Sequence, residues 1–170
     1  ETNNSRGEAT VLSNIGIANY DLKEYEKALT HYRKALEIWQ LFGNKFGIAT
    51  NLGNIANTYT NLFEYSKALD YYKEALVLND ELGNKFGNAA ILGSMGVLYF
   101  QLTQDSILTN LKEHNSNTGL IQLKRDYHLY KSIVYSEQAV RIAREIGAKD
   151  MLMEWLKYLD KANAEKKNFK

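Results

Sequence analysis

The chain has 170 residues, enough for one compact domain or one short array of repeats. Its 21 basic and 20 acidic side chains leave a formal net charge of +1, so the strongly basic surface of a nucleic-acid binder is missing. There is no cysteine and no proline, which excludes disulfides and thiolate chemistry and suits a nearly all-helical chain. No apolar run approaches the roughly 18 residues of a membrane-spanning helix, so we expect no membrane insertion.

The first half of the chain contains one pattern twice, at an offset of 40 residues. Nearly half of the aligned positions are identical, and the identical apolar residues recur at helical spacing. Gly43 and Gly83 close the two copies, as expected of a glycine just after the end of a helix. Each copy therefore predicts two antiparallel helices joined by a short turn, in the second copy at about 47–61 and 64–82. A period of this length is typical of a stacked solenoid.

A third copy begins at Gly87, but it is interrupted. Its second half resumes at an offset of 64 rather than 40 and ends at Gly147, so an insertion lies within about 103–127. A turn-like stretch, 115–119, divides the insertion, and the apolar spacing on both sides of it is helical. We expect both helices to extend outward and to meet in a loop near 115–119; a disordered loop is the alternative. The apolar residues that could join the extended helices are Ile107, Leu111, Leu120 and Leu123.

Beyond Gly147 the pattern restarts, but only one helix follows. Residues 151–166 carry the spacing of a first helix, and no partner helix comes after them. Because the last repeat of a solenoid would otherwise expose its apolar face, we predict that 151–166 is a capping helix.

The repeated positions carry a family resemblance. Small residues, Ala56 and Ala68, stand where paired helices would cross, and large residues such as Leu52 and Tyr59 stand between them at helical spacing. The sequence resembles the tetratricopeptide-repeat family at these positions, although the first copy has Asn19 where an aromatic residue is usual. The 40-residue period and the motif Asn-Leu-Gly-Asn at 51–54 are similar to the longer repeats of spindle-orientation adaptors, kinesin light chains and bacterial signalling proteins.

This resemblance implies an all-α fold, a right-handed superhelix (α-solenoid) of about three helix pairs plus a C-terminal capping helix. It also implies a single array over residues 1–170, with repeats at about 7–46, 47–86 and 87–150.

No pattern of catalytic or ligating residues is present. His31, His114 and His128 lie in no recognised metal-ligand spacing, and Asp126 with His128 indicates polar residues on an exposed helix rather than a metal site. The glycines are explained by their repeat positions rather than by a phosphate-binding loop, and no serine lies in a nucleophile motif. We therefore expect no enzyme activity, no catalytic residue, no metal and no cofactor.

The resemblance further implies that the first helix of each pair lines a concave groove. Asparagine carries both a donor and an acceptor, so a row of asparagines can pair with the amides of an extended peptide. The alternative is that these asparagines hydrate the face or bond neighbouring helices. A clamp for the carboxylate end of a chaperone is not expected, because only Asn54 matches its residues. The candidate groove residues are Asn14, Ile17, Tyr20, Asn54, Asn57, Asn61, Val97, Phe100, Gln101 and Tyr158.

These observations favour a non-enzymatic scaffold that binds a peptide or a helical segment of a protein partner. The alternative is a regulatory or sensor domain from a larger signalling enzyme of the cyclase or histidine-kinase type, and self-association through exposed edges is a third reading. The partner's identity is not encoded in any pattern that we find. We expect a cytoplasmic protein without a nucleic-acid partner, and a removed signal peptide stays an open alternative.

Overall fold

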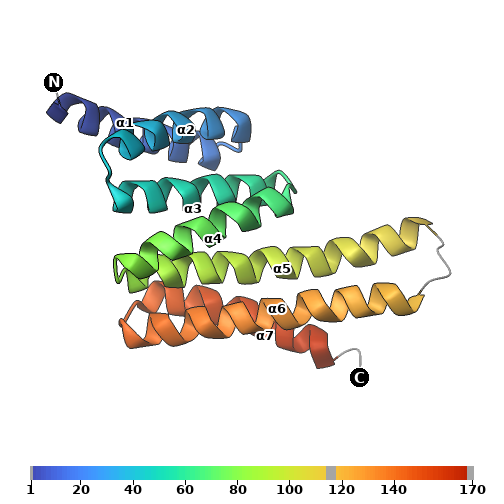
Figure 1. The fold of residues 1–170 in the computed structure, drawn as a ribbon. Helices are drawn as coiled ribbons and strands as arrows, with labels where there is room; N and C mark the ends of the chain where they lie inside the picture. Colours follow the sequence, from blue (N-terminus) through green and yellow to red (C-terminus); the bar gives the residue numbers. More distant parts are fainter. Residues whose placement is uncertain (1, 114–117, 168–170) are drawn as a thin grey trace. The chain divides into compact units, whose positions relative to one another are not determined.

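The structure is a computed structural model that describes residues 2–113 and 118–167, with side chains at 6–105 and 122–167. This part of the chain consists of seven α-helices and contains no strand, which confirms the predicted all-α fold (Figure 1). The helices are α1 (Thr2–Asp21), α2 (Tyr25–Leu41), α3 (Lys45–Asn61), α4 (Tyr65–Glu81), α5 (Lys85–Glu113), α6 (Thr118–Glu145) and α7 (Lys149–Lys167).

The helices group into two compact units. Unit 1 comprises Glu1–Gly87 and contains α1 to α4 with the first residues of α5, and unit 2 comprises Asn88–Lys170. In unit 1, α1 packs on α2, α2 on α3, and α3 on α4. This packing of successive helices on their chain neighbours is the arrangement predicted for repeated helix pairs.

The repeated segment Asn-Lys-Phe-Gly connects one pair to the next in unit 1. After α2, Gly43 adopts a φ of +61°, which a residue with a Cβ rarely adopts. The amide of Asn44 then donates to the carbonyl of Trp39 at 3.0 Å, which closes a Schellman motif. The side chain of the same Asn44 accepts from the Gly47 amide at 3.0 Å and so caps the start of α3. One asparagine thus ends a helix with its backbone and begins the next with its side chain.

The copy at residues 84–87 repeats this geometry. Gly83 has a φ of +62°, and the amide of Asn84 donates to the Asn79 carbonyl at 2.8 Å. The Asn84 side chain accepts from the Gly87 amide at 3.0 Å. The same four residues therefore recur because the same connection recurs.

Within each pair of unit 1 the turn is different. Lys23 and Phe63 each have a φ of 61°, although neither is a glycine. The amides of the residues that follow them donate back to Asn19 and Tyr59 at 2.8 and 2.9 Å. These two turns therefore hold a left-handed residue with a side chain, a conformation that costs about 1–2 kcal/mol relative to the right-handed one.

Small residues allow the paired helices of unit 1 to approach closely. Ala28 and Ala68 are fully buried, as is Ala56. A Cβ on Gly16 would lie 2.5 Å from the Tyr32 ring, so the absence of a side chain on α1 makes room for this tyrosine of α2. The tyrosine is 2% exposed. The crossing positions are thus filled as the small-residue pattern predicted.

In unit 2, α5 and α6 are long helices of 29 and 28 residues, against 17 for α3 and α4. They run side by side, and the Ser132 hydroxyl donates to the carbonyl of Gly96 at 2.8 Å (Figure 1). The predicted outward extension of both helices is therefore confirmed. The loop predicted near 115–119 lies largely outside the described residues, as do the side chains of Ile107, Leu111 and Leu120.

One part of the prediction for the insertion is wrong. Leu123 was expected to help join the extended helices, but its side chain is 68% exposed. Leu129, two turns further along α6, is 4% exposed and belongs to the core of unit 2. The helical spacing predicted the helix correctly, but Leu123 lies on its exposed side, since Arg125, only two residues further along, is 3% exposed.

The single C-terminal helix predicted at 151–166 is α7, which packs against α6. Gly147 precedes it with a φ of +70°, and the amide of Ala148 donates to the Ala143 carbonyl at 2.9 Å. Trp155 and Ala162 are its buried residues. The connection from α6 to α7 thus has the same Schellman geometry as those of unit 1.

Candidate functional site

The candidate groove residues fall into the two units. Unit 1 holds Asn14, Ile17, Tyr20, Asn54, Asn57 and Asn61, whereas unit 2 holds Val97, Phe100, Gln101 and Tyr158.

Unit 1 contains a hollow of about 230 Å³ on the face made by its first helices. Residues from three helices line it, and four of them belong to the predicted groove. The hollow is lined by Ile17, Tyr20 and Asp21 of α1, Tyr32 of α2, and Asn54 and Asn57 of α3. The structure thus brings together predicted residues that lie nearly 40 positions apart in the sequence.

The asparagines of α3 differ in how far they are already bonded. Asn57 lines the hollow and accepts from the Tyr72 hydroxyl at 2.6 Å through its Oδ1, and its Nδ2 has no hydrogen-bond partner among the described residues. Asn61 donates to the Tyr20 hydroxyl at 2.7 Å and to the carbonyl of Asn57 at 3.0 Å. These two asparagines therefore bond neighbouring helices, as one of the two sequence readings held. Only Asn57 also faces the hollow.

Asn54 differs from these two asparagines in its bonding. It is half-buried and lines the hollow. Within the part of the chain that the structure describes, its side-chain amide makes no hydrogen bond. An amide of this kind can pair with both the N–H and the C=O of one peptide unit. Asn14, by contrast, is exposed and does not line the hollow.

The tyrosines supply the aromatic wall of the hollow. Because the Tyr20 oxygen accepts from Asn61, its own proton is available to donate. Burial is the main cause that raises the pKa of Tyr20, the charges of Tyr25 and Asp21 raise it further, and the Asn61 bond lowers it. The pKa of Tyr32 is raised as well, first by burial and then by the charges of Tyr20 and Asp21. Both phenols therefore stay protonated at neutral pH.

Two lining residues escaped the sequence-based list of candidate residues. The ring of Tyr32 is buried against α1, yet it also forms part of the wall of the hollow. Asp21 lies at the last position of α1, directly after the predicted Tyr20. The signal that points to Tyr32 is Gly16, because a glycine at a helix crossing leaves room for a large partner.

In unit 2 the candidate residues pack against other side chains of the same unit. Phe100 packs against the cluster of Leu129, Ile133 and Ala162, and Val97 is half-buried. Tyr158 lies beside Trp155 with ring centroids 6.5 Å apart, and the ammonium of Lys161 lies 5.1 Å from its ring. Gln101 has a buried Oε1 without a hydrogen-bond partner among the described residues. Their part in a groove stays a prediction.

The helix α7 covers part of the first-helix face of α5. A Cβ on Gly93 would lie 2.2 Å from the Trp155 ring, so the indole sits directly on the glycine backbone. Here the face is occupied by the chain's own capping helix rather than open to a ligand.

The described residues contain no group of three or more His, Asp or Glu side chains that could hold a metal ion. None of the helices that the structure describes is both long and apolar enough to cross a membrane.

Comparison with known proteins identifies the fold. Residues 7–81 match the family model described as tetratricopeptide repeat. This match covers α1 to α4 almost completely, and the helices continue in the same order through α7. The match identifies residues 7–81 as tetratricopeptide repeats, and it does not extend over the rest of the chain. Among curated proteins, none matches the chain, so the resemblance to particular adaptors or signalling proteins stays a prediction.

Proposed function

We propose that the chain is a non-enzymatic interaction module that binds a peptide or helical segment of a protein partner on the first-helix face of unit 1. Tetratricopeptide repeats generally mediate protein–protein interaction, which supports the class of function. The observation that carries the proposal is the hollow itself, where Asn54 offers a half-buried amide without a bond among the described residues. A buried amide of this kind is stabilised when a peptide unit completes its hydrogen bonds.

The hollow suits a peptide better than a free small molecule. It is shallow for a cofactor site, because about 230 Å³ is below the roughly 300–1,000 Å³ of typical ligand pockets. Its polar groups, Asn54 and Asn57, are separated by three residues on one helix, so they project from one face about one turn apart. A chain that runs along α3 can therefore meet both amides and place one side chain in the hollow.

The test is a change of Asn54→Ala, compared with Lys73→Ala plus Glu74→Ala on the exposed side of α4. Displayed random peptides retained by the wild-type protein serve as ligands. We expect Asn54→Ala to weaken binding by about 0.5–1.5 kcal/mol, the value of one hydrogen-bonded pair, and the α4 change to leave it unaltered. Loss of binding with the α4 variant, together with unchanged binding by Asn54→Ala, would rule out this face as the site.

Asn57→Ala is a poorer probe, although it lines the same hollow. Its Oδ1 accepts from Tyr72, and that hydroxyl also lies 3.3 Å from the Thr60 hydroxyl inside the core. Removal of the amide would leave a buried hydroxyl with one partner fewer, so a loss of binding could reflect a loss of stability. Asn54 has no such structural bond, and its change isolates the contribution to a ligand.

A further inference from the structure

The charge at the hollow is of one sign. Of the described residues that line it, Asp21 alone has a formal charge. Among the described residues Asp21 has no ion-pair partner, and its side chain is exposed. The other positions of this face on α1 and α3 that are not fully buried carry no lysine, arginine or histidine: they are Thr10, Ser13, Asn14, Ile17, Tyr20, Thr50, Asn54, Asn57 and Asn61.

The position of Asp21 is unfavourable for the helix that carries it. It is the last residue of α1, where the negative end of the helix dipole repels a carboxylate. The equivalent position in the next repeat, 40 residues later, is the neutral Asn61. Helix stability therefore does not explain a carboxylate here, and an uncharged amide fits the same place in this fold.

The wall of the hollow complements the charge. Ile17 and the rings of Tyr20 and Tyr32 offer apolar surface, and Asp21 stands beside them. Its negative charge acts on both tyrosine hydroxyls and raises the pKa of each, after the larger effect of burial. An anionic side chain would meet the same repulsion. A lysine or arginine would place its aliphatic stem on the apolar wall and its charge near the carboxylate and the aromatic rings.

We infer that this hollow receives one basic side chain, lysine or arginine, from the bound peptide. The volume of about 230 Å³ accommodates a single long side chain rather than a folded segment. Asp21 provides the charge partner, and Asn54 with Asn57 holds the backbone next to it. This inference rests on the proposed peptide-binding function and adds the chemical class of the ligand.

The experiment uses peptides selected by the full chain from a displayed random library. We expect the retained peptides to share a lysine or arginine at one position. One such peptide is then synthesised with arginine and with citrulline, which has the same shape without the charge. Both are titrated against the wild-type protein and against Asp21→Asn. Citrulline should weaken binding to the wild type by roughly 2- to 5-fold, the range of an exposed ion pair, and should leave binding to Asp21→Asn nearly unchanged.

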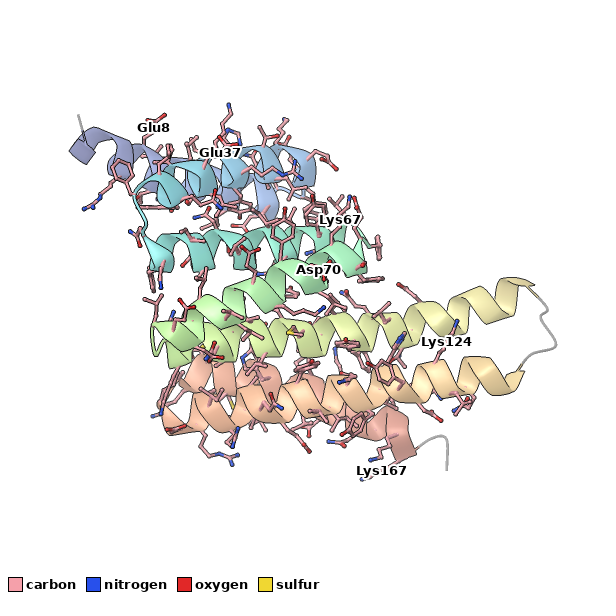
Figure 2. All side chains as sticks on the ribbon, in the orientation of Figure 1. Glu8, Glu37, Lys67, Asp70, Lys124 and Lys167 are labelled. Atoms are coloured by element: carbon pink, nitrogen blue, oxygen red, sulfur yellow. The ribbon has the colours of Figure 1, made fainter. Side chains whose placement is uncertain are left out.

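A matched control and two contrary outcomes complete the test. Asp70→Asn makes the same substitution at an exposed carboxylate of α4 that pairs with Lys73, and it should behave as the wild type (Figure 2). If citrulline weakens binding equally in wild type and Asp21→Asn, or if no basic residue is shared, the inference is wrong. Weaker binding by Asn54→Ala would then still support the proposed function. If no peptide is retained, or if Asn54→Ala and Asp21→Asn both leave binding unchanged, both proposals fail. Circular dichroism of each variant verifies that it is folded.

Discussion

The helices α1 and α3 occupy the same place in successive repeats, yet one face of each is buried to a very different degree. On α3, Trp39 of α2 lies against Gly47, and Arg33 of α2 bonds the hydroxyl of Tyr59. Residues at four-residue spacing between these two share the same side of the helix. The α2-facing stripe of α3 is therefore Gly47, Asn51, Ile55 and Tyr59. The equivalent stripe of α1 is Gly7, Val11, Ile15 and Asn19.

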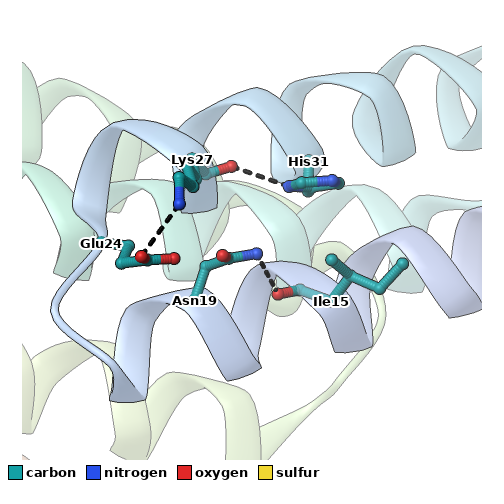
Figure 3. A network of polar contacts seen from close by, with 5 residues as sticks. All are labelled: Ile15, Asn19, Glu24, Lys27 and His31. Carbon is teal, nitrogen blue, oxygen red and sulfur yellow. Dashed lines mark hydrogen bonds and ion pairs between the residues drawn. The ribbon is translucent and has the colours of Figure 1, made fainter.

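The two stripes differ in what covers them. Asn51 and Ile55 are 1% and 0% exposed, whereas Val11 and Ile15 are 56% and 40% exposed. Asn19 turns back on its own helix and donates to the Ile15 carbonyl at 2.8 Å (Figure 3). Tyr59, in the same register, instead stacks on Tyr71 with ring centroids 5.6 Å apart. The departure from the family pattern at Asn19 thus falls on the stripe that no described helix covers.

This comparison shows that the packing of neighbouring helices, and not the residue type, determines how far a position in a repeat protein is buried. Isoleucine stands at position 15 and at position 55, and only its neighbours decide whether it contributes to the core. The energetic value of each repeat position therefore depends on the repeat beside it, as nearest-neighbour descriptions of solenoids hold.

The largest expected effect comes from the two isoleucines. Ile55→Ala should destabilise the protein by about 2–5 kcal/mol, because it empties a fully buried site. Ile15→Ala should lower stability by about 1 kcal/mol or less, because its side chain is partly in water already. Urea denaturation followed by circular dichroism measures both. Equal losses would mean that the stripe of α1 is covered in solution, and light scattering would then show whether a second copy covers it.

The glycines of the two stripes should respond with opposite signs. A Cβ on Gly47 would lie 2.5 Å from the Trp39 ring, near the base of a side chain that cannot easily move aside. Gly47→Ala should therefore cost about 1–3 kcal/mol by overpacking.

Gly7 is the matched control, because a Cβ there would meet nothing within 4 Å. Gly7→Ala should stabilise α1 by about 0.5–1 kcal/mol through helix propensity. Thermal denaturation of the two variants gives the signs directly. A stabilising Gly47→Ala would show that α2 and α3 are not held as closely as the structure has them.

The helices and their ends could be predicted from the sequence because the repeat displays each element twice. The helix expected at about 47–61 is Lys45–Asn61, and Gly43 and Gly83 adopt the left-handed conformation that their positions required. Turn chemistry and helical spacing are local properties, so a single sequence contains them. The insertion could be predicted for the same reason, because the second half of the third copy resumes at an offset of 64 residues rather than 40.

The candidate site was only partly predictable, because it depends on side-chain pairing between helices. Whether Asn57 and Asn61 bond neighbours or a ligand was open, and the answer rests on the hydroxyls of Tyr72 and Tyr20. Tyr32 occupies in the first repeat the position of Tyr72 in the second. The residue equivalent to Asn57 is Ile17, which cannot accept a hydrogen bond from the Tyr32 hydroxyl. The same core residue therefore bonds inside one pair and lines a hollow in the other.

The smallest expected effect concerns the turn within each pair, which should not distinguish the two repeats. Lys23 and Phe63 hold the same φ of 61° at the position that glycine occupies in the other connections. Lys23→Gly should stabilise the protein by about 0.5–1 kcal/mol, because the strain of a left-handed residue exceeds the added entropy of glycine in the unfolded chain. Phe63→Gly should stabilise the protein less than Lys23→Gly, because it also removes the edge contact with Tyr65, whose ring centroid lies 6.2 Å from that of Phe63. Gly43→Ala makes the opposite change, because it places a side chain on a residue with a φ of +61°, and it should destabilise the protein. Urea denaturation of the three variants measures these shifts, and a destabilising Lys23→Gly would show that the lysine side chain, rather than its backbone conformation, holds this turn.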